Sequence, residues 1–273
     1  MALPKIRMPA VAGQFYPGTA QELKRQIEGF IDYKAAKRDV IGCILPHAGY
    51  IYSGQVAAET VSNIQVKEKV ILLGPNHTGF GTPYSIMTEG QWQTPLGNVN
   101  IDSALSKRIL EGSKYLQDDA AAHMREHSLE VELPFLQYFR SDFRIVPIAF
   151  MTDSLEGLKA VGREIAEAVK KEGLEKKTLL VASSDMTHYE SQADAKVKDD
   201  QAINAILELD EDKLMERVRR LDISMCGYAP AIAMISAAKA LGAKTAKLIK
   251  YSTSGDVTGD RDSVVGYAGI TVY

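Results

Sequence analysis

The sequence predicts an α/β fold: a three-layer sandwich in which a mostly parallel central sheet is covered by helices. Short β-branched runs alternate with longer helical patterns along the chain, an order typical of parallel sheets. The runs Val40–Leu45 and Lys69–Leu73 are largely apolar, as expected for strands buried on both faces. No linker rich in Pro, Gly or Ser and no repeat divides the chain. We therefore expect a single domain over residues 1–273.

The elements follow from these alternating patterns. The predicted strands are Val40–Leu45, Lys69–Leu73, Arg144–Phe150, Thr178–Ala182, Ala246–Ser252 and Val264–Val272. The predicted helices are Ser53–Asn63, Ser103–Gly112, Leu129–Arg140, Leu155–Glu172, Asp194–Leu209, Glu211–Arg220 and Pro230–Leu241. A region rich in turns, including Gly90–Gly97, lies between the second and third strands.

Composition excludes several classes of protein. Apolar residues make up 45% of the 273 residues, enough for a sizeable core. The net charge is −3, so no basic excess indicates nucleic-acid binding. The longest apolar stretch, Ala229–Ala238, contains Ser236 and is far shorter than a membrane span. The N-terminal residues lack an apolar run of signal-peptide length, so we expect a cytoplasmic protein without a membrane segment.

Histidines follow three of the predicted strands. His47, His77 and His188 each lie just after such a strand, and they are three of only five histidines. Because the carboxyl ends of parallel strands share one edge of a sheet, these side chains are expected to converge there. His47 and His77 are flanked by Pro and Gly turn residues, and neutral imidazole is a common ligand of iron, copper and zinc. The pattern therefore predicts a metal pocket.

Two imidazoles need a third anchor, and Cys226 is the candidate. It lies at the entry to the helix that Pro230 opens, where the helix dipole stabilises a thiolate. The alternative is that Cys226 is a small buried hydrophobic residue, as cysteine usually is. Cys43 lies in the middle of an apolar strand and is interpreted as a core residue. Two cysteines do not form a disulfide framework.

Asp185 and His188 lie three residues apart on a predicted turn. This spacing lets a carboxylate orient an imidazole that acts as a general base, although Asp185 could equally cap the turn. The neighbouring Ser183 has no Gly-x-Ser-x-Gly motif around it, so a serine nucleophile is not expected. Of the remaining histidines, His123 is expected at the surface and His127 in the pocket.

Six ordered motifs carry a resemblance to the Memo family. They are Leu45–Tyr50, Gly74–His77, Trp92–Gly97, Glu126–Pro134, Ser184–Tyr189 and Met225–Gly227. The match extends from Gly13–Pro17 to Asp262–Tyr267, nearly the whole chain. The Memo family is similar in fold to the LigB-type extradiol dioxygenases, which are non-haem iron enzymes that open catechol rings.

The resemblance implies a role for each residue of the pocket. His47 and His77 stand where the dioxygenases keep two histidine ligands, and Cys226 falls where they have a carboxylate ligand. His127 resembles a histidine that contacts oxygen or substrate, and His188 resembles the acid/base histidine. The resemblance also implies partners, because members of the family are often found beside radical-SAM and AMMECR-type proteins.

The replacement of a carboxylate by Cys226 changes the expected chemistry. A thiolate is softer and can itself be oxidised, which shifts metal preference toward zinc or cuprous copper while iron stays first. We expect one transition-metal ion and a metal-dependent, oxygenase-like redox enzyme acting on an aromatic or phenolic group. The alternatives are a hydrolase with Cys226 as nucleophile and a non-enzymatic module that binds a peptide or partner protein.

Overall fold

The computed structural model describes residues 6–273, and all strands in this part of the chain join one twelve-stranded sheet. The strands are β1 (Ile6–Arg7), β2 (Gly42–Leu45), β3 (Lys69–Pro75), β4 (Tyr84–Ile86), β5 (Gln91–Thr94), β6 (Gly97–Ile101), β7 (Gln117–Asp118), β8 (Arg144–Phe150), β9 (Thr178–Ser183), β10 (Asp185–Glu190), β11 (Ala246–Thr253) and β12 (Val264–Val272). The order is β1-β5-β6-β8-β3-β9-β2-β12-β10, with β11 on β12, β4 on β8 and β7 on β4.

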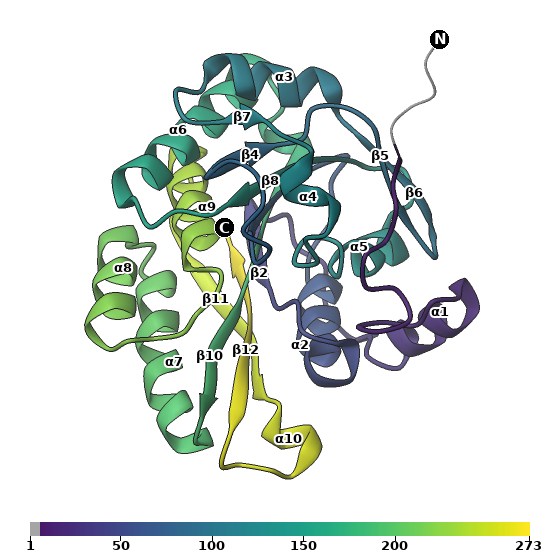
Figure 1. Ribbon diagram of the computed structural model, residues 1–273, viewed down its shortest axis with the longest axis vertical. Coiled ribbons are helices and arrows are strands. Elements are labelled where there is room, and N and C mark those ends of the chain that lie inside the picture. The colour runs from purple at the N-terminus through teal and green to yellow at the C-terminus, as the bar shows by residue number, and fades with distance from the viewer. Residues whose placement is uncertain (1–5) are drawn as a thin grey trace.

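Helices cover both faces of this sheet (Figure 1). The α-helices are α1 (Ala20–Glu28), α2 (Tyr50–Ser62), α3 (Ser103–Gly112), α4 (Ala121–Met124), α5 (Leu133–Phe139), α6 (Leu155–Lys171), α7 (Gln192–Leu207), α8 (Glu211–Arg220), α9 (Tyr228–Ala240) and α10 (Gly255–Thr258). A short 3-10 turn, Glu175–Lys177, precedes β9. Figure 1 places α1, α2 and α5 on one side of the sheet and α6 to α9 on the other.

The alternation of side chains along β3 explains the two apolar layers. Val70 and Leu72 pack into the cluster that contains residues of α1, α2 and α5, whereas Ile71 and Leu73 pack into the cluster with α6 and α9. Successive side chains of a strand point to opposite faces, so a strand that is apolar throughout is covered on both faces. The predicted three-layer α/β fold with a mostly parallel sheet is confirmed. In the described residues no helix has the length and apolarity needed to cross a bilayer.

The sheet changes direction beside β2. The pairs β6–β8, β8–β3, β3–β9 and β9–β2 are parallel, but β12 runs antiparallel to β2, β10 and β11. The last residues of β12 pair with β2 and its first residues pair with β10. The ribbon formed by β10 and β12 therefore projects beyond the carboxyl edge of the parallel strands, toward α10 (Figure 1).

Two predicted elements differ from the structure. The segment after the fourth predicted strand, expected to be a loop, forms β10, because its backbone pairs with β12. The helix predicted from Leu129 begins only at Leu133, and residues 128–132 form turns that stay at the edge of the sheet. The region rich in turns forms the β5–β6 hairpin.

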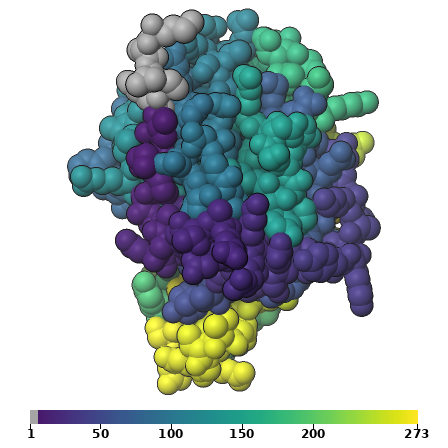
Figure 2. All heavy atoms as spheres, turned by 90° about the vertical axis from the view of Figure 1, so that its right-hand side faces the viewer, coloured from purple at the N-terminus to yellow at the C-terminus, as the bar shows by residue number. Residues whose placement is uncertain are grey.

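The segment from β1 to α1 lies across the outside of the molecule (Figure 2). Its strand β1 pairs in parallel with β5, and α1 packs against α5. This placement brings residues 7–16 beside the segment that follows α4. That segment carries Glu126 and Glu130, which accept hydrogen bonds from Arg7 and Ala10 through the Glu126 carbonyl and the Glu130 carboxylate.

Candidate metal centre

The structure brings the three predicted metal ligands together. His47 lies two residues after β2, His77 two residues after β3, and Cys226 two residues before α9. One ligand atom of each, an imidazole nitrogen or the thiol sulfur, lies within 4.8 Å of the other two. The Cys226 Sγ is 3.4 Å from the His47 Nε2. Ligands bonded to one ion at about 2.0–2.3 Å lie about 3–4 Å apart, so the distance between Sγ and Nε2 fits a shared ion.

A glycine allows Cys226 to approach the sheet. A Cβ at Gly227 would lie 2.2 Å from the Ser183 carbonyl oxygen and 2.3 Å from the Ser184 Cβ, so only glycine fits there. The Gly227 N–H donates to the Ser184 Oγ at 3.0 Å, which fixes the start of α9 against the end of β9. The thiol is consequently held at the edge of the sheet where the histidines lie.

The hydrogen bonds of His47 determine which ring nitrogen is free. The Ser183 hydroxyl has a single proton and donates it to the Ser128 carbonyl at 2.9 Å. It therefore accepts the hydrogen bond from the His47 Nδ1, 2.7 Å away. The proton lies on Nδ1, and the lone pair of Nε2 faces Cys226. Burial, followed by the neighbouring His127 and His77, holds the pKa of His47 well below its usual range, so the ring is neutral.

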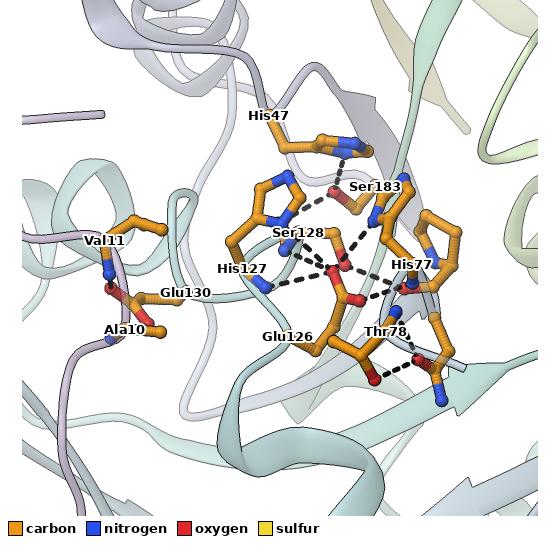
Figure 3. Close-up of polar contacts among 12 residues, drawn as sticks. Ala10, Val11, His47, His77, Thr78, Glu126, His127, Ser128, Glu130 and Ser183 are labelled. Atoms are coloured by element: carbon orange, nitrogen blue, oxygen red, sulfur yellow. Dashed lines mark hydrogen bonds and ion pairs between the residues drawn. The ribbon is translucent and has the colours of Figure 1, made fainter. Parts of the chain in front are cut away.

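Glu126 determines in the same way which ring nitrogen of His77 is free. Its carboxylate accepts hydrogen bonds from the N–H groups of His77, His127 and Ser128 and from the His77 Nδ1 at 2.9 Å (Figure 3). Burial raises the pKa of Glu126, but the hydrogen bonds from His77 and Ser128 outweigh burial and bring it to about 2. An ionised carboxylate only accepts, so the His77 Nδ1 carries the proton and Nε2 is free. A carboxylate behind a histidine is the usual support of a metal-ligating imidazole.

A second group of possible ligands shares His77. Ligand atoms of His77, Glu126 and His127 also lie within 4.8 Å of one another. The Glu126 carboxylate, however, is 1% exposed and already accepts four hydrogen bonds. Its Oε1 accepts three of these bonds and its Oε2 one, so an ion there would compete with the donors that hold the segment, and the group with Cys226 is the better candidate.

His127 lies beside both proposed ligand histidines. Its ring centroid is 4.9 Å from that of His77 and 5.5 Å from that of His47. Phe15 packs its ring against His127 at 4.9 Å, edge to face. Burial lowers the pKa of His127, and the Glu126 charge offsets this in part. His127 therefore presents a largely neutral imidazole to the same cavity.

The environment of Cys226 differs from the expectation of a stabilised thiolate. Burial raises the pKa of the thiol, and the charge of Asp185 raises it further. The N–H of Asp185 donates to the Sγ at 3.3 Å and lowers the pKa only in part. Burial and charge outweigh the helix dipole, so in this environment the thiol is protonated at neutral pH.

Asp185 and His188 do not form the predicted pair. The Asp185 Oδ1 accepts the backbone N–H of His47 at 2.8 Å, and burial raises the pKa of Asp185 to about 6. The His188 Nδ1 lies 3.0 Å from the carbonyl oxygen of Ser224. The backbone N–H of His188 donates to the Ser224 Oγ at 2.7 Å. A carbonyl only accepts, so His188 is left with Nε2 as its basic nitrogen. Ser224, rather than Asp185, orients His188.

His123 is not at the surface. It is fully buried, with its ring centroid 5.9 Å from that of Trp92. Burial, followed by the charge of Arg7, lowers the pKa of His123 to about 4. It belongs to the packing beneath the N-terminal segment.

Glu130 attaches the N-terminal segment to the site. Its carboxylate accepts from Arg7, from the N–H groups of Ala10 and Val11 and from the Tyr16 hydroxyl. Arg7 also donates to the carbonyl oxygens of His123 and Glu126. The segment that carries Phe15 is thereby bound to the turn that carries Glu126.

Several functional neighbours were not assigned from the sequence. They are Glu126, Ser128, Glu130, Ser183 and Ser224. All five lie in or beside the ordered motifs, but their roles depend on contacts over long sequence separations, such as that between residues 77 and 126. One signal was available: Glu126 directly precedes a pocket histidine, and a buried acid behind a ligand histidine is common.

A cavity of about 740 Å³ opens over the cluster. Its wall includes His47, His77, His127, Asp185 and His188, so every predicted site residue except Cys226 lines it.

The sequence matches known proteins over nearly its whole length. The family described as Memo-like protein matches residues 7–271. A MEMO1 family protein of Methanosarcina barkeri is 46% identical, over 98% of this chain and 100% of the relative. Those of Methanopyrus kandleri and Nitrosopumilus maritimus are each 44% identical, over 97% of this chain and 98% of the relative.

The fold also resembles a solved structure. The crystal structure of an uncharacterised protein from Escherichia coli K12 superposes with a TM-score of 0.57 and 14% sequence identity. The alignment covers 84% of this chain and 98% of that chain, and it shows a likeness of fold alone. With the family match over residues 7–271 and identities of 44% to 46% over nearly full length, the chain belongs to the Memo family.

Proposed function

We propose that the protein is a metal-dependent redox enzyme of the oxygenase type that acts on a phenolic group. The observation that carries the proposal is that ligand atoms of His47, His77 and Cys226 lie within 4.8 Å of one another, and that both histidines line an open cavity. The proton of each ligand imidazole is fixed on Nδ1 by Ser183 or by Glu126. Ligands held in this way fit a transition-metal ion, with iron first and copper or zinc as alternatives.

Each residue has a distinct part in the proposed reaction. His47, His77 and Cys226 hold the ion, which when bound supplies Lewis acidity and redox capacity toward a phenolic oxygen. His188, oriented by Ser224, removes a proton from the phenol through its Nε2. His127, whose ring lies between Phe15 and His77, donates a hydrogen bond to developing negative charge on oxygen.

The hydrolase alternative is less well supported. A nucleophilic cysteine needs a lowered pKa, and burial together with Asp185 raises that of Cys226. A metal ion displaces the thiol proton on binding, so a raised pKa is compatible with the ligand role. The binding-module alternative stays open, since a cavity alone does not distinguish ligand binding from turnover.

The two cysteines offer a matched test of the metal site. We expect Cys226→Ser to lose most bound metal, while its metal-free form unfolds at nearly the same urea concentration as metal-free wild type. Cys43 is fully buried in β2, so Cys43→Ser is expected to retain metal but lose about 1–3 kcal/mol of stability. Metal content by mass spectrometry and urea unfolding would be measured on both variants. Equal metal content in wild type and Cys226→Ser would refute the ligand role.

His188 tests whether a reaction occurs. His188→Gln is expected to retain metal but slow turnover by about 10²–10⁴-fold. The assay is oxygen uptake by metal-loaded protein with a panel of phenols and catechols. We expect slow turnover of simple catechols, because a thiolate replaces the carboxylate of the dioxygenase ligand set. Loss of metal from His188→Gln would instead make His188 a ligand, and absence of turnover across the panel would favour a binding module.

A further inference from the structure

The cavity above the metal centre has walls of two kinds. One wall is formed by the histidine cluster and Phe15. A second wall comes from the ribbon of β10 and β12 and from α10 with the loop that follows it, and it includes Tyr189, Asp260 and Tyr267. At about 740 Å³ the cavity exceeds what a single phenol ring fills, so a substrate reaches both walls. The residues of the second wall therefore contribute to which substrates bind.

The fixed charges of this cavity are of one sign. Asp185 and Asp260 line the cavity, whereas no lysine or arginine among the described residues does. Asp185 lies deep, where it accepts the His47 N–H. Arg261 lines a separate cavity with Lys196, so its guanidinium does not balance the charge of Asp260 from within this one. Away from the ion that His47, His77 and Cys226 would hold, a ligand that enters meets negative charge and no basic side chain among the described residues.

Asp260 is held in place but is not neutralised. Its Oδ1 accepts the Asp262 N–H at 2.9 Å, and its own N–H donates to the Thr258 Oγ1 at 3.1 Å. Within residues 6–273 the Asp260 carboxylate has no ion-pair partner. Its charge is thus available to a ligand.

Aromatic rings line the space on either side of these charges. Phe15 lies against His127, while Tyr52 of α2 and Tyr189 and Tyr267 of the ribbon also line the cavity. Aromatic faces bind phenol rings by stacking, and they also attract ammonium groups. A wall of tyrosines next to an unpaired carboxylate is a receptor for a cation rather than for an anion.

We propose that the substrate is a phenol or catechol that carries a protonated amine, with the ammonium group bound at Asp260. The placement of the phenolic end at His47, His77 and Cys226 rests on the proposed function; the placement of the ammonium end rests on the charge and aromatic lining of the ribbon wall. A phenol with a carboxylate tail meets repulsion at this wall, so the cavity selects against it.

Three catechols that differ only in the charge of the tail test the proposal. They are dopamine, 4-ethylcatechol and 3-(3,4-dihydroxyphenyl)propionate, which are cationic, neutral and anionic at pH 7. Binding to zinc-loaded protein is measured by calorimetry at low salt. We expect dopamine to bind about tenfold more tightly than the propionate, with 4-ethylcatechol between them. Raising the salt concentration should reduce the difference.

Two neighbouring aspartates provide the variant and its control. Asp260→Asn keeps the acceptor for the Asp262 N–H and should reduce the amine preference to about twofold or less. Asp262 is equally exposed but does not line the cavity, so Asp262→Asn should leave the preference unchanged. Equal effects of the two variants, or propionate binding as tight as dopamine binding, would overturn the proposal.

The same data separate this proposal from the proposed function. If 4-ethylcatechol binding is lost in His47→Ala but no amine preference exists, the metal centre stands and the assignment of Asp260 fails. If none of the three catechols binds to protein that retains zinc, both fail.

Discussion

The two regions that flank the cavity, one behind the metal ligands and one in the ribbon of β10 and β12, are built in opposite ways. On the clamp side, which we define as Arg7, Glu126 and Glu130 with their partners, each buried carboxylate accepts hydrogen bonds from four donor groups. On the ribbon side, formed by β10, β12 and α10, Tyr189 is 78% exposed and Asp260 is exposed. The side that faces the metal ligands is preorganised, and the side that faces the far end of a substrate is open and lightly held.

This difference has a physical reason. Metal ligands must be held within fractions of an ångström, which buried charge-assisted hydrogen bonds achieve. A wall that admits and releases a ligand gains from few buried contacts, since such regions open at low cost in free energy. Substitutions on the two sides should therefore have different consequences.

The largest effect on stability is expected from Glu130→Gln. The change leaves the fully buried Arg7 guanidinium without its carboxylate partner and presents an amide to the N–H groups of Ala10 and Val11. We expect a loss of about 3–5 kcal/mol, as for other broken buried ion pairs. Urea unfolding measures it. A loss below about 1 kcal/mol would mean that the clamp does not hold the N-terminal segment.

Glu126→Gln should affect the metal centre more directly. The amide oxygen of Gln can accept from only some of the four donors that the carboxylate binds, and its NH2 group accepts none, so the His77 imidazole loses its fixed orientation. We expect metal affinity to fall about 10–100-fold. Competition with a chelator gives the affinity, and Glu130→Gln serves as the control, because it lies on the same turn but does not contact His77. An equal fall in metal affinity in both variants would show that either change disorders the whole segment, rather than that Glu126 acts on His77.

Glu132, the third buried acid of this turn, provides a pH test. Burial raises its pKa well above 4.5, a nearby Ser183 hydroxyl offsets this in part, and the Asp185 charge adds to it. Above pH 4.5 the unfolded chain releases a proton that the folded protein keeps, so stability falls as pH rises toward the folded pKa. Each pH unit in that window costs about 1.4 kcal/mol.

Glu132→Gln keeps the shape of the protonated acid and removes this dependence. We expect the variant to gain stability over wild type as pH rises above 4.5, and to match wild type more closely below it. The comparison is made by urea unfolding at a series of pH values, and other titrating groups cancel in the difference. Parallel curves for the two proteins would show that Glu132 is ionised in the folded state.

The smallest effect on stability is expected on the ribbon side. Tyr189 has φ 61°, a conformation that glycine adopts without strain, and its side chain is mostly exposed. Tyr189→Gly should change stability by less than about 1 kcal/mol. The same variant should weaken catechol binding, because it removes an aromatic ring from the cavity wall. Unchanged binding would exclude Tyr189 from contact with the ligand.

Much of the fold follows from the sequence alone. The apolar strands β2, β3, β8 and β9 and the amphipathic helices α6 and α8 have local patterns that tertiary contacts reinforce. The positions of His47 and His77 follow in turn, because a residue just after a buried parallel strand lies at the carboxyl edge of the sheet. The six ordered motifs also identified the family.

Only the tertiary structure decided which groups support these residues. The sequence placed Asp185 beside His188 on a turn, but β10 forms because its backbone pairs with β12, and this pairing directs Asp185 to the His47 N–H. The four donors to Glu126 come from two segments about fifty residues apart, and no local pattern specifies their meeting. The thiol of Cys226 lies near a helix start, yet burial dominates its pKa. Local sequence determines periodicity and strand ends, whereas hydrogen-bond partners and pKa values depend on burial and distant neighbours, which only the folded chain defines.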